Sequence, residues 1–294
     1  MAVFEGVIPA IITPMDDEGS FNEDAFRQVM EFNIEAGVHG FWIAGGTGES
    51  ILLSDEENMR IASVAADQSQ GRVKNIMHVG APTTDRAARL AEHAARQNVE
   101  AICCVPPFFY QQTDKNIAEH YRIVAAAADL PLFVYNLPQA TGVEISPDLL
   151  RRIQETVPQL KGLKHSSQIF PNVRTFADMN LNCLIGNSQL MLPALTIGAT
   201  GCVDGPPIVA PEYWVEIWKA YREGDLKRAE VAQDRAGRLW KSLDKCGGGF
   251  HSLAKAALSE RLGIQCGAAR QPAAPLTNEQ KTVLREIMTK LELV

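Results

Sequence analysis

Two short runs decide the fold of this chain: Leu132-Phe133-Val134-Tyr135-Asn136-Leu137-Pro138 and Leu160-Lys161-Gly162-Leu163-Lys164-His165. Each is an apolar run that carries a reactive polar side chain near its end, Tyr135 in the first and Lys164 in the second. Continuous apolar runs of this length are typical of parallel strands that are covered by helices. If the two runs are neighbouring parallel strands, the phenol and the amine lie at the same end of one sheet.

Similar apolar runs alternate with helical patterns along most of the chain. The six further runs are 7–12, 40–44, 75–79, 101–105, 183–185 and 201–203. Between them, Ser54 and Glu57 form a capping box, and Ser146 precedes a proline at a first helical position. Eight strand–helix units predict an α/β fold, a (β/α)8 TIM barrel. A doubly wound open sheet is the runner-up, but Thr13-Pro14-Met15-Asp16 after the first run offers no phosphate or dinucleotide loop.

The pattern changes near Gly224, where the alternation of strands and helices stops. Helices are expected over 225–245 and 252–262, and Thr277 caps a third helix. The glycines 247–249 predict a turn between the first two helices. We therefore expect two domains, a catalytic barrel over residues 1–224 and a C-terminal helical domain over residues 225–294.

Composition limits the classes of function. The 294 residues are 46% hydrophobic and carry a net charge of -7, with the basic residues scattered, so a nucleic-acid surface is not expected. The six cysteines include no CxxC pair, which argues against a zinc site or a disulfide framework. No apolar stretch reaches the ~20 residues that span a bilayer, and Met1–Gly6 shows no signal-peptide pattern. We expect a cytoplasmic protein that contacts no membrane.

A glycine-rich loop follows the second predicted strand, at the end where barrel enzymes place their chemistry. In Gly45-Gly46-Thr47-Gly48-Glu49-Ser50, the glycines let several backbone N–H groups point towards one anion. The hydroxyl of Thr47 adds a donor, so the loop suits a small carboxylate. The loop lacks the Gly-Lys-Ser/Thr ending of a P-loop, and a plain glycine turn is the alternative interpretation.

Lys164 and Tyr135 predict imine chemistry. Side chains alternate along a strand, so Lys164 shares a face with Gly162, which leaves room for the amine inside the barrel, whereas Lys161 points the other way. A neutral amine attacks a ketone, and the resulting iminium ion withdraws electrons from the neighbouring carbon. A phenol on the adjacent strand can relay protons. This chemistry needs no metal and no cofactor, and its substrate is a small 2-keto acid.

At these motifs the chain resembles the pyruvate-dependent class I aldolases, the family typified by dihydrodipicolinate synthase and N-acetylneuraminate lyase. Residues 45–49 are similar to the family's carboxylate-binding Gly-Thr-Thr-Gly-Glu motif, 135–138 to its Tyr-Asn-x-Pro motif, and 162–164 to its Schiff-base lysine motif. The resemblance implies a barrel with a C-terminal helical domain, assembled as a homotetramer or homodimer. It also implies that Lys164 forms the imine, Tyr135 relays protons, and Gly46, Thr47 and Gly48 bind the carboxylate of the pyruvate moiety.

The chain departs from the synthases of that family at three positions. The synthases carry a hydroxyl residue at the position of Gly46. At the position of Phe109 they carry a tyrosine that reaches into the active site of a neighbouring subunit, and in this chain the nearest tyrosine is Tyr110, one residue further on. Ala140 stands at the position of the arginine with which the synthases bind the carboxylate of their aldehyde substrate. The motif Pro-x-Ala-Thr-Gly, which contains Ala140, is more similar to the corresponding motif of aldolases that act on 2-keto-3-deoxy sugar acids.

Four functions are therefore weighed. The leading one is a Schiff-base lyase that cleaves or forms a pyruvate–aldehyde adduct, such as a 2-keto-3-deoxy sugar acid. The alternatives are a dehydratase that uses the same imine, a dihydrodipicolinate synthase, and a keto-acid-binding barrel without catalysis. Besides the residues above, we expect His165, Val203 and Asp204 at the barrel mouth to contact substrate. For His165 a packing role is the alternative, and for Asp204 it is capping of the next turn. His78 is interpreted as a core histidine with satisfied hydrogen bonds.

Overall fold

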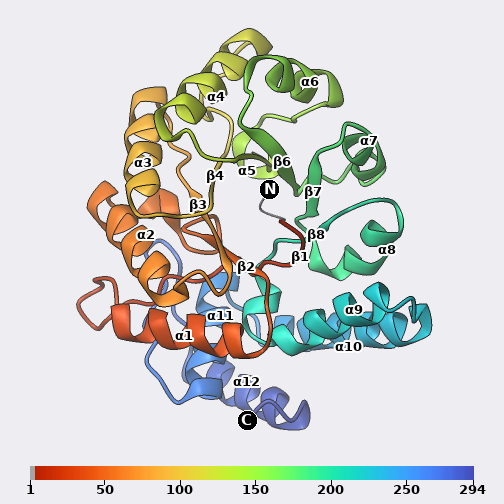
Figure 1. Cartoon of the computed structure of the whole chain (residues 1–294). Helices are drawn as coiled ribbons and strands as arrows, with labels where there is room; N and C mark the ends of the chain where they lie inside the picture. Colours follow the sequence, from red (N-terminus) through yellow and green to blue (C-terminus); the bar gives the residue numbers. More distant parts are fainter. Residues whose placement is uncertain (1–3) are drawn as a thin grey trace.

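The protein, described over residues 4–294 by a computed structural model, is a barrel of eight parallel strands ringed by helices (Figure 1). The first three residues of the segment Met1–Gly6 lie outside the described residues. The strands are β1 Gly6–Val7, β2 Gly40–Ile43, β3 Lys74–His78, β4 Ala101–Cys104, β5 Leu132–Asn136, β6 Leu160–His165, β7 Asn182–Ile185 and β8 Gly201–Cys202. All eight predicted strands are present, which confirms the predicted TIM barrel.

The strand order closes the sheet on itself. Strands β2 to β8 pair in sequence, and β1 pairs with β8. The segment after β1 completes the ring, because Ala10 bridges to Trp42 of β2. The predicted first strand, 7–12, is longer than the regular β1, which ends at Val7. Pro9 gives the reason, since a proline has no N–H to contribute to a ladder.

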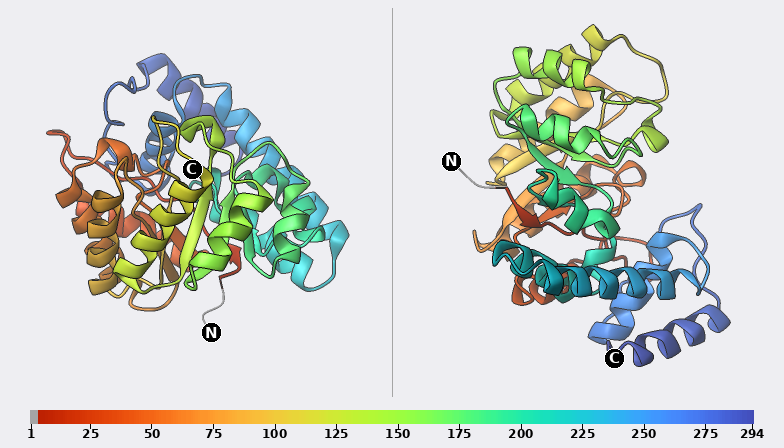
Figure 2. Two further views of the ribbon diagram at one scale, coloured as in Figure 1. Left: turned by 90° about the horizontal axis from the view of Figure 1, so that it is seen from above. Right: turned by 90° about the vertical axis from the view of Figure 1, so that its right-hand side faces the viewer.

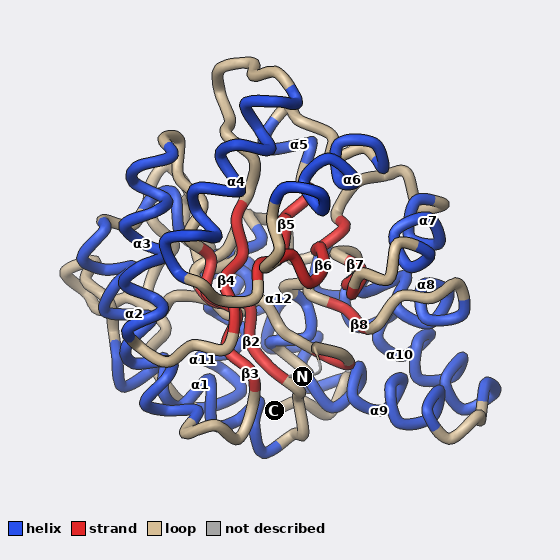
Figure 3. The backbone as a smooth tube through the Cα atoms, turned by 45° about the horizontal axis from the view of Figure 1, so that its top comes forward, coloured by secondary structure: helices blue, strands red, loops and turns tan. Residues whose placement is uncertain are grey.

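Helices follow the strands and cover the barrel on the outside (Figure 3). They are α1 Glu23–Glu35, α2 Asp55–Ser69, α3 Thr84–Arg96, α4 Asp114–Ala128, α5 Pro138–Thr141, α6 Pro147–Thr156, α7 Asn172–Asp178, α8 Met191–Thr196 and α9 Pro211–Arg222. The predicted capping box of α2 is present, with Ser54 Oγ accepting from Glu57 N and Glu57 accepting from Ser54 N. Three 3₁₀ turns, Ser50–Leu52, Ser188–Leu190 and Pro206–Ile208, follow β2, β7 and β8.

Side-chain alternation divides the core into two layers. A small cluster inside the barrel contains Phe4, Trp42, Phe133 and Tyr135, and a large cluster lies between the strands and the helices. In β6, Lys164 and Gly162 are buried while Lys161 is exposed, as the alternation predicts. The inner layer is therefore the one that can carry a site at the barrel mouth.

Three helices complete the chain after the last strand–helix unit. They are α10 Leu226–Asp244, α11 Phe250–Leu262 and α12 Asn278–Lys290, and α10 packs along α9. In the right-hand view of Figure 2, α11 and α12 (blue) lie at the lower right, to one side of the barrel strands. The boundary at residue 224 stays a prediction. Within residues 4–294, no helix combines the length and apolar character that a membrane span needs.

Candidate active site

Strands β5 and β6 place Tyr135 directly beside Lys164. The two residues are paired in the register of the strands, and the Lys164 Nζ lies 4.3 Å from the centroid of the Tyr135 ring. Both side chains are almost buried, with 4% of Lys164 and 5% of Tyr135 exposed. The structure thus brings together the amine and the phenol that the sequence singled out, inside the barrel near the carboxyl ends of their strands.

A tryptophan completes an aromatic surround for the amine. The Lys164 Nζ lies 5.4 Å from the centroid of Trp42, and the Trp42 and Tyr135 rings meet edge to face at 5.5 Å. Aromatic faces attract cations, and an iminium ion keeps a positive charge at this nitrogen. The two rings would therefore stabilise the charged intermediate of imine chemistry.

Gly162 has a different role from the expected one. A side chain at this position would begin 2.1 Å from the Asn182 carbonyl oxygen and 2.8 Å from the Phe133 ring. The space that the glycine leaves is therefore filled by strand β7 and by the inner layer, and not by the amine. The glycine permits the close approach of neighbouring strands that sets the position of Lys164.

The glycine-rich loop after β2 is held in an uncommon conformation. Ala44 and Glu49 both have positive φ angles, 49° and 61°, which non-glycine residues seldom adopt. A side chain on Gly48 would begin 2.9 Å from the Ala44 Cα, so the loop is too tight for one. The Thr13 hydroxyl donates to the Gly48 carbonyl at 2.7 Å and fixes the turn. The loop is therefore a tight, fixed turn, and its anion-binding role stays a prediction.

Helix α11 supports the same loop from behind. Lys255 of α11 forms an ion pair with Glu49 at 2.7 Å, and both side chains are buried. Burial lowers the pKa of Lys255, and the Glu49 carboxylate opposes that shift. Glu49 also accepts a hydrogen bond from the Arg270 backbone N–H at 2.6 Å, and His251 donates to the Gly46 carbonyl at 2.8 Å. These contacts could not be predicted from the sequence, because the partners lie in different predicted domains.

A cavity of 130 Å³ opens beside Tyr135. Its lining residues are Gly46, Ser50, Ile51, His78, Val105, Phe108, Tyr135, Leu137, Ala140 and Thr141. Gly46 and Ala140 therefore lie where the sequence placed them. A side chain at position 46 would begin 3.7 Å from the Tyr135 hydroxyl, an ordinary van der Waals distance, so a hydroxyl residue there would lie next to the phenol.

Phe109 and Tyr110 do not line this cavity. They are 87% and 74% exposed, and their rings pack on each other at 5.0 Å. Phe109 also has a left-handed φ of 76°. The loop turns both rings away from the cavity of their own chain, and the predicted substrate contacts of Phe109 and Tyr110 stay predictions.

For His165 the structure shows the packing alternative, and for Asp204 it shows the capping alternative, while substrate contact by Asp204 stays a prediction. His165 lies outside the barrel, edge to face with Phe176 at 5.2 Å and within 3.2 Å of the Asn136 amide nitrogen, because it alternates with Lys164 along β6. Asp204 accepts hydrogen bonds from the backbone N–H groups of Ser188 and Gly205, both at 2.8 Å, so it caps turns. Val203 is fully buried in the inner layer.

His78 differs from its predicted role as a satisfied core histidine. Its side chain is 3% exposed, yet neither ring nitrogen has a partner within hydrogen-bond geometry among residues 4–294. Burial lowers the pKa of His78 to about 4, the Lys164 charge adds to that shift, and the Ala44 backbone opposes it. The ring faces Tyr135 edge to face at 6.3 Å. The histidine therefore belongs to the wall of the cavity.

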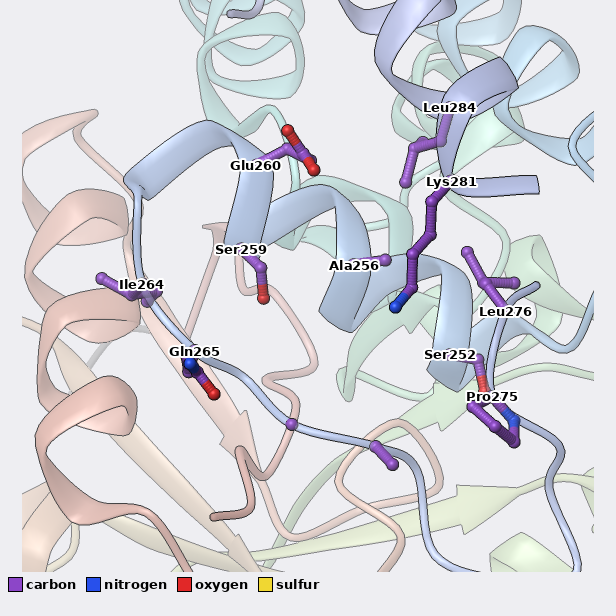
Figure 4. A pocket seen from close by; sticks show the side chains of 12 residues that line it. Ser252, Ala256, Ser259, Glu260, Ile264, Gln265, Pro275, Leu276, Lys281 and Leu284 are labelled. Carbon is purple, nitrogen blue, oxygen red and sulfur yellow. The ribbon is translucent and has the colours of Figure 1, made fainter. Parts of the chain in front are cut away.

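A second cavity, of 290 Å³, lies within the C-terminal helices (Figure 4). It is bounded by α11, by the segment 264–276 and by the start of α12, and Lys281 points into it. None of the residues at the carboxyl ends of the strands lines it. The chemistry that Lys164 and Tyr135 support is therefore confined to the barrel mouth.

Known proteins resemble the chain along its whole length. A 4-hydroxy-tetrahydrodipicolinate synthase of Methanothrix thermoacetophila is 33% identical over 293 residues, covering 98% of this chain and 97% of that protein. An uncharacterized DapA-like lyase of Halobacterium salinarum is 34% identical over 291 residues, covering 98% and 94%. The structure of CdNal from Clostridium difficile, determined with mannosamine, superposes with a TM-score of 0.93 at 27% identity, covering 99% and 100%.

The family model of the dihydrodipicolinate synthetase family matches residues 3–291, a span that contains the glycine-rich loop, Tyr135, Lys164 and the helices behind them. The match confirms the resemblance read from the three motifs. With the motifs, the barrel and nearly the whole chain in agreement, the protein belongs to the dihydrodipicolinate synthetase family and is a lyase of the class I aldolase type.

Proposed function

We propose that this protein is a Schiff-base-forming lyase that cleaves or forms a pyruvate–aldehyde adduct, with a 2-keto-3-deoxy sugar acid as the adduct. The main support is that Tyr135 and Lys164 are paired on neighbouring strands beside a cavity, and that no arginine or lysine lines this cavity. A second carboxylate on the aldehyde would find no cation there, whereas a sugar-like aldehyde needs none. Lys164 forms the imine, Tyr135 transfers protons, and the loop at Gly46, Thr47 and Gly48 holds the carboxylate.

The test begins with wild-type protein, pyruvate and borohydride, followed by peptide mass mapping. A reduced pyruvyl adduct on Lys164 supports the imine, and its absence with every 2-keto acid tried removes the proposal. Pyruvate is then offered with glyceraldehyde and longer sugar aldehydes, and pyruvate consumption is measured. Turnover at an ordinary rate, on the order of 1 per second, would also exclude a barrel that only binds keto acids.

Two alternatives rest on specific observations. The relatives named 4-hydroxy-tetrahydrodipicolinate synthase favour synthesis from pyruvate and aspartate semialdehyde, which the same assay tests directly. The missing hydroxyl at Gly46 and the outward Phe109 favour dehydration through the same imine, because they weaken the hydroxyl relay for the aldehyde. Release of pyruvate from a 2-keto-3-deoxy sugar acid supports the lyase, and loss of water without pyruvate supports the dehydratase.

Replacing Tyr135 by phenylalanine is expected to lower kcat/KM about 10²–10³-fold, because general acid–base catalysis by one group contributes on this scale. The remaining ring still packs against Trp42 and the Lys164 amine, so the fold and the position of Lys164 are kept. The borohydride adduct should form more slowly but still on Lys164. A kcat/KM within about threefold of wild type would exclude the phenol as the proton relay.

We also propose that the outward aromatic pair Phe109–Tyr110 packs against a second copy of the chain, in a homodimer or homotetramer. Two adjacent exposed rings favour an interface. Phe109→Asp is expected to shift the protein to a smaller species in sedimentation velocity, since aspartate tolerates the left-handed φ of 76° and adds a charge. Val231→Asp, at a residue 56% exposed on α10, is the matched control. Equal sedimentation of both variants and wild type would contradict this interface.

A further inference from the structure

Both ring nitrogens of His78, in the cavity wall, are buried and lack a partner within hydrogen-bond geometry among residues 4–294, although the Ala44 backbone acts on the ring as a weak hydrogen-bond partner. Of the residues that line this cavity, His78 alone has side-chain polar atoms that are buried and lack a partner within hydrogen-bond geometry. The Thr141 hydroxyl, by contrast, donates to the Leu137 carbonyl at 3.0 Å. Buried polar groups in native proteins are normally paired, and an unpaired one calls for an explanation.

The local sequence builds space for this ring. His78 ends β3 and shares its face with Ile76 of the inner layer, which directs the side chain into the barrel. A side chain on Gly80 would begin 2.7 Å from the His78 Nε2 and 2.9 Å from its Cε1. The φ angle of Gly80 is not in the left-handed region, so its backbone conformation does not require a glycine. The missing side chain instead leaves room for the ring of His78. The glycine at position 80 is therefore what lets the imidazole of His78 fit at this place.

The charge state of His78 suits a neutral hydrogen-bonding role. Its pKa of about 4 leaves the ring uncharged near neutral pH, with one nitrogen as donor and the other as acceptor. The charged or titratable groups that face it are Lys164, Tyr135 and the buried thiol of Cys103, its register partner on β4. A neutral ring can lie close to a cationic iminium without repelling it.

The position of His78 relative to the proposed imine defines its ligand. In the proposed function, the loop at Gly46 holds the carboxylate of the keto acid, and Lys164 holds the second carbon. In that arrangement the part of the substrate beyond the second carbon would occupy the cavity that Gly46, Tyr135 and His78 line. That part carries the oxygen that is a hydroxyl in the adduct and a carbonyl in the free aldehyde.

We infer that His78 binds this oxygen, the one on the fourth carbon of the keto-acid adduct, through its neutral imidazole. The inference rests on the proposed function. It makes His78 the polar partner that compensates for the missing hydroxyls at Gly46 and Phe109.

The test compares two ligands that differ only in that oxygen, 4-hydroxy-2-ketobutanoate and 2-ketobutanoate. The half-saturating concentration of each is measured from the rate of borohydride inactivation, and the mass of the adduct on Lys164 shows which acid was trapped. Wild type is expected to prefer the hydroxylated acid by about tenfold, the scale of one good hydrogen bond. His78→Leu should reduce this preference to about one, and His78→Gln should keep part of it.

Two further variants test whether a change in ligand preference comes from the ring of His78. Gly80→Ala crowds the ring of His78 without altering the residue itself, and should also lower the preference. His93→Gln, at a histidine of α3 away from the cavity, should leave it unchanged. Thermal unfolding is measured in parallel, and His78→Leu is expected to melt at or above the wild-type temperature, because it removes unpaired buried polar atoms.

The outcomes separate the inference from the function on which it rests. A wild-type adduct on Lys164, with the same ligand preference in His78→Leu as in wild type, overturns the role of His78 and leaves the imine intact. The absence of any adduct in wild type overturns the proposed function itself. If His78→Leu does not fold, an unchanged preference in both His78→Gln and Gly80→Ala overturns the inference, and a lowered preference in both supports it.

Discussion

Lys164→Met is expected to abolish adduct formation with 2-keto acids and to lower turnover on the order of 10⁴-fold or more, because catalysis through a covalent intermediate ends with the loss of its nucleophile. Methionine keeps the length and the apolar stem of lysine. It also fills the space between the Trp42 and Tyr135 rings, which lie 5.4 and 4.3 Å from the wild-type amine. The fold should therefore survive, and the loss should be chemical.

The matched control is Lys161→Met, because Lys161 lies on the same strand with its side chain exposed on the opposite face. This variant should trap pyruvate and turn over as wild type does. The measurement is borohydride reduction followed by peptide mapping, with circular dichroism to compare the folds. A pyruvyl adduct on any other lysine in the Lys164→Met protein, with turnover retained, would contradict the assignment of the imine to Lys164.

The Lys164–Tyr135 pair could be predicted from sequence because it depends only on regular strand geometry. Side chains alternate along a parallel strand, and neighbouring strands end at the same edge, so two short runs were enough to place both residues. The same alternation predicted that Lys161 points outward. It gave the packing alternative for His165, whose ring lies between β6 and α7.

The rest of the site depends on contacts that no local pattern encodes. The lack of well-placed hydrogen-bond partners for the ring of His78 can be recognised only when every neighbour of the ring is known. The outward turn of Phe109 follows from a left-handed backbone that the flanking prolines and aromatics do not specify. Asp204 caps a turn after β7, an element that comes earlier in the chain. Each contact joins residues that tertiary structure alone brings together.

The ion pair between Glu49 and Lys255 is the strongest of these long-range contacts, and it gives the second prediction. Lys255→Met is expected to lower the free energy of unfolding by about 3–5 kcal/mol, because it leaves a buried carboxylate without its partner. Lys255 is fully buried, and its Nζ also donates to the Ala268 carbonyl at 3.0 Å. Urea unfolding, followed by circular dichroism, measures the loss.

The control is Lys227→Met, which breaks an exposed Lys–Glu pair on α10 in the same part of the chain. Exposed pairs contribute little, so the urea midpoint should stay where it is in wild type. The double variant Glu49→Gln, Lys255→Met removes both charges and should recover part of the lost stability, since the cost comes from the unpaired charge and not from the missing attraction. An equal loss in the single and double variants would contradict this explanation.

The same variant links the C-terminal helices to the proposed chemistry. Glu49 has a left-handed φ of 61° and receives the Arg270 N–H at 2.6 Å, so its carboxylate holds the end of the glycine-rich loop in place. In Lys255→Met, the half-saturating concentration for pyruvate trapping should rise about tenfold, while the adduct still forms on Lys164. An unchanged half-saturation alongside lower stability would mean that the ion pair holds α11 to the barrel without positioning the loop.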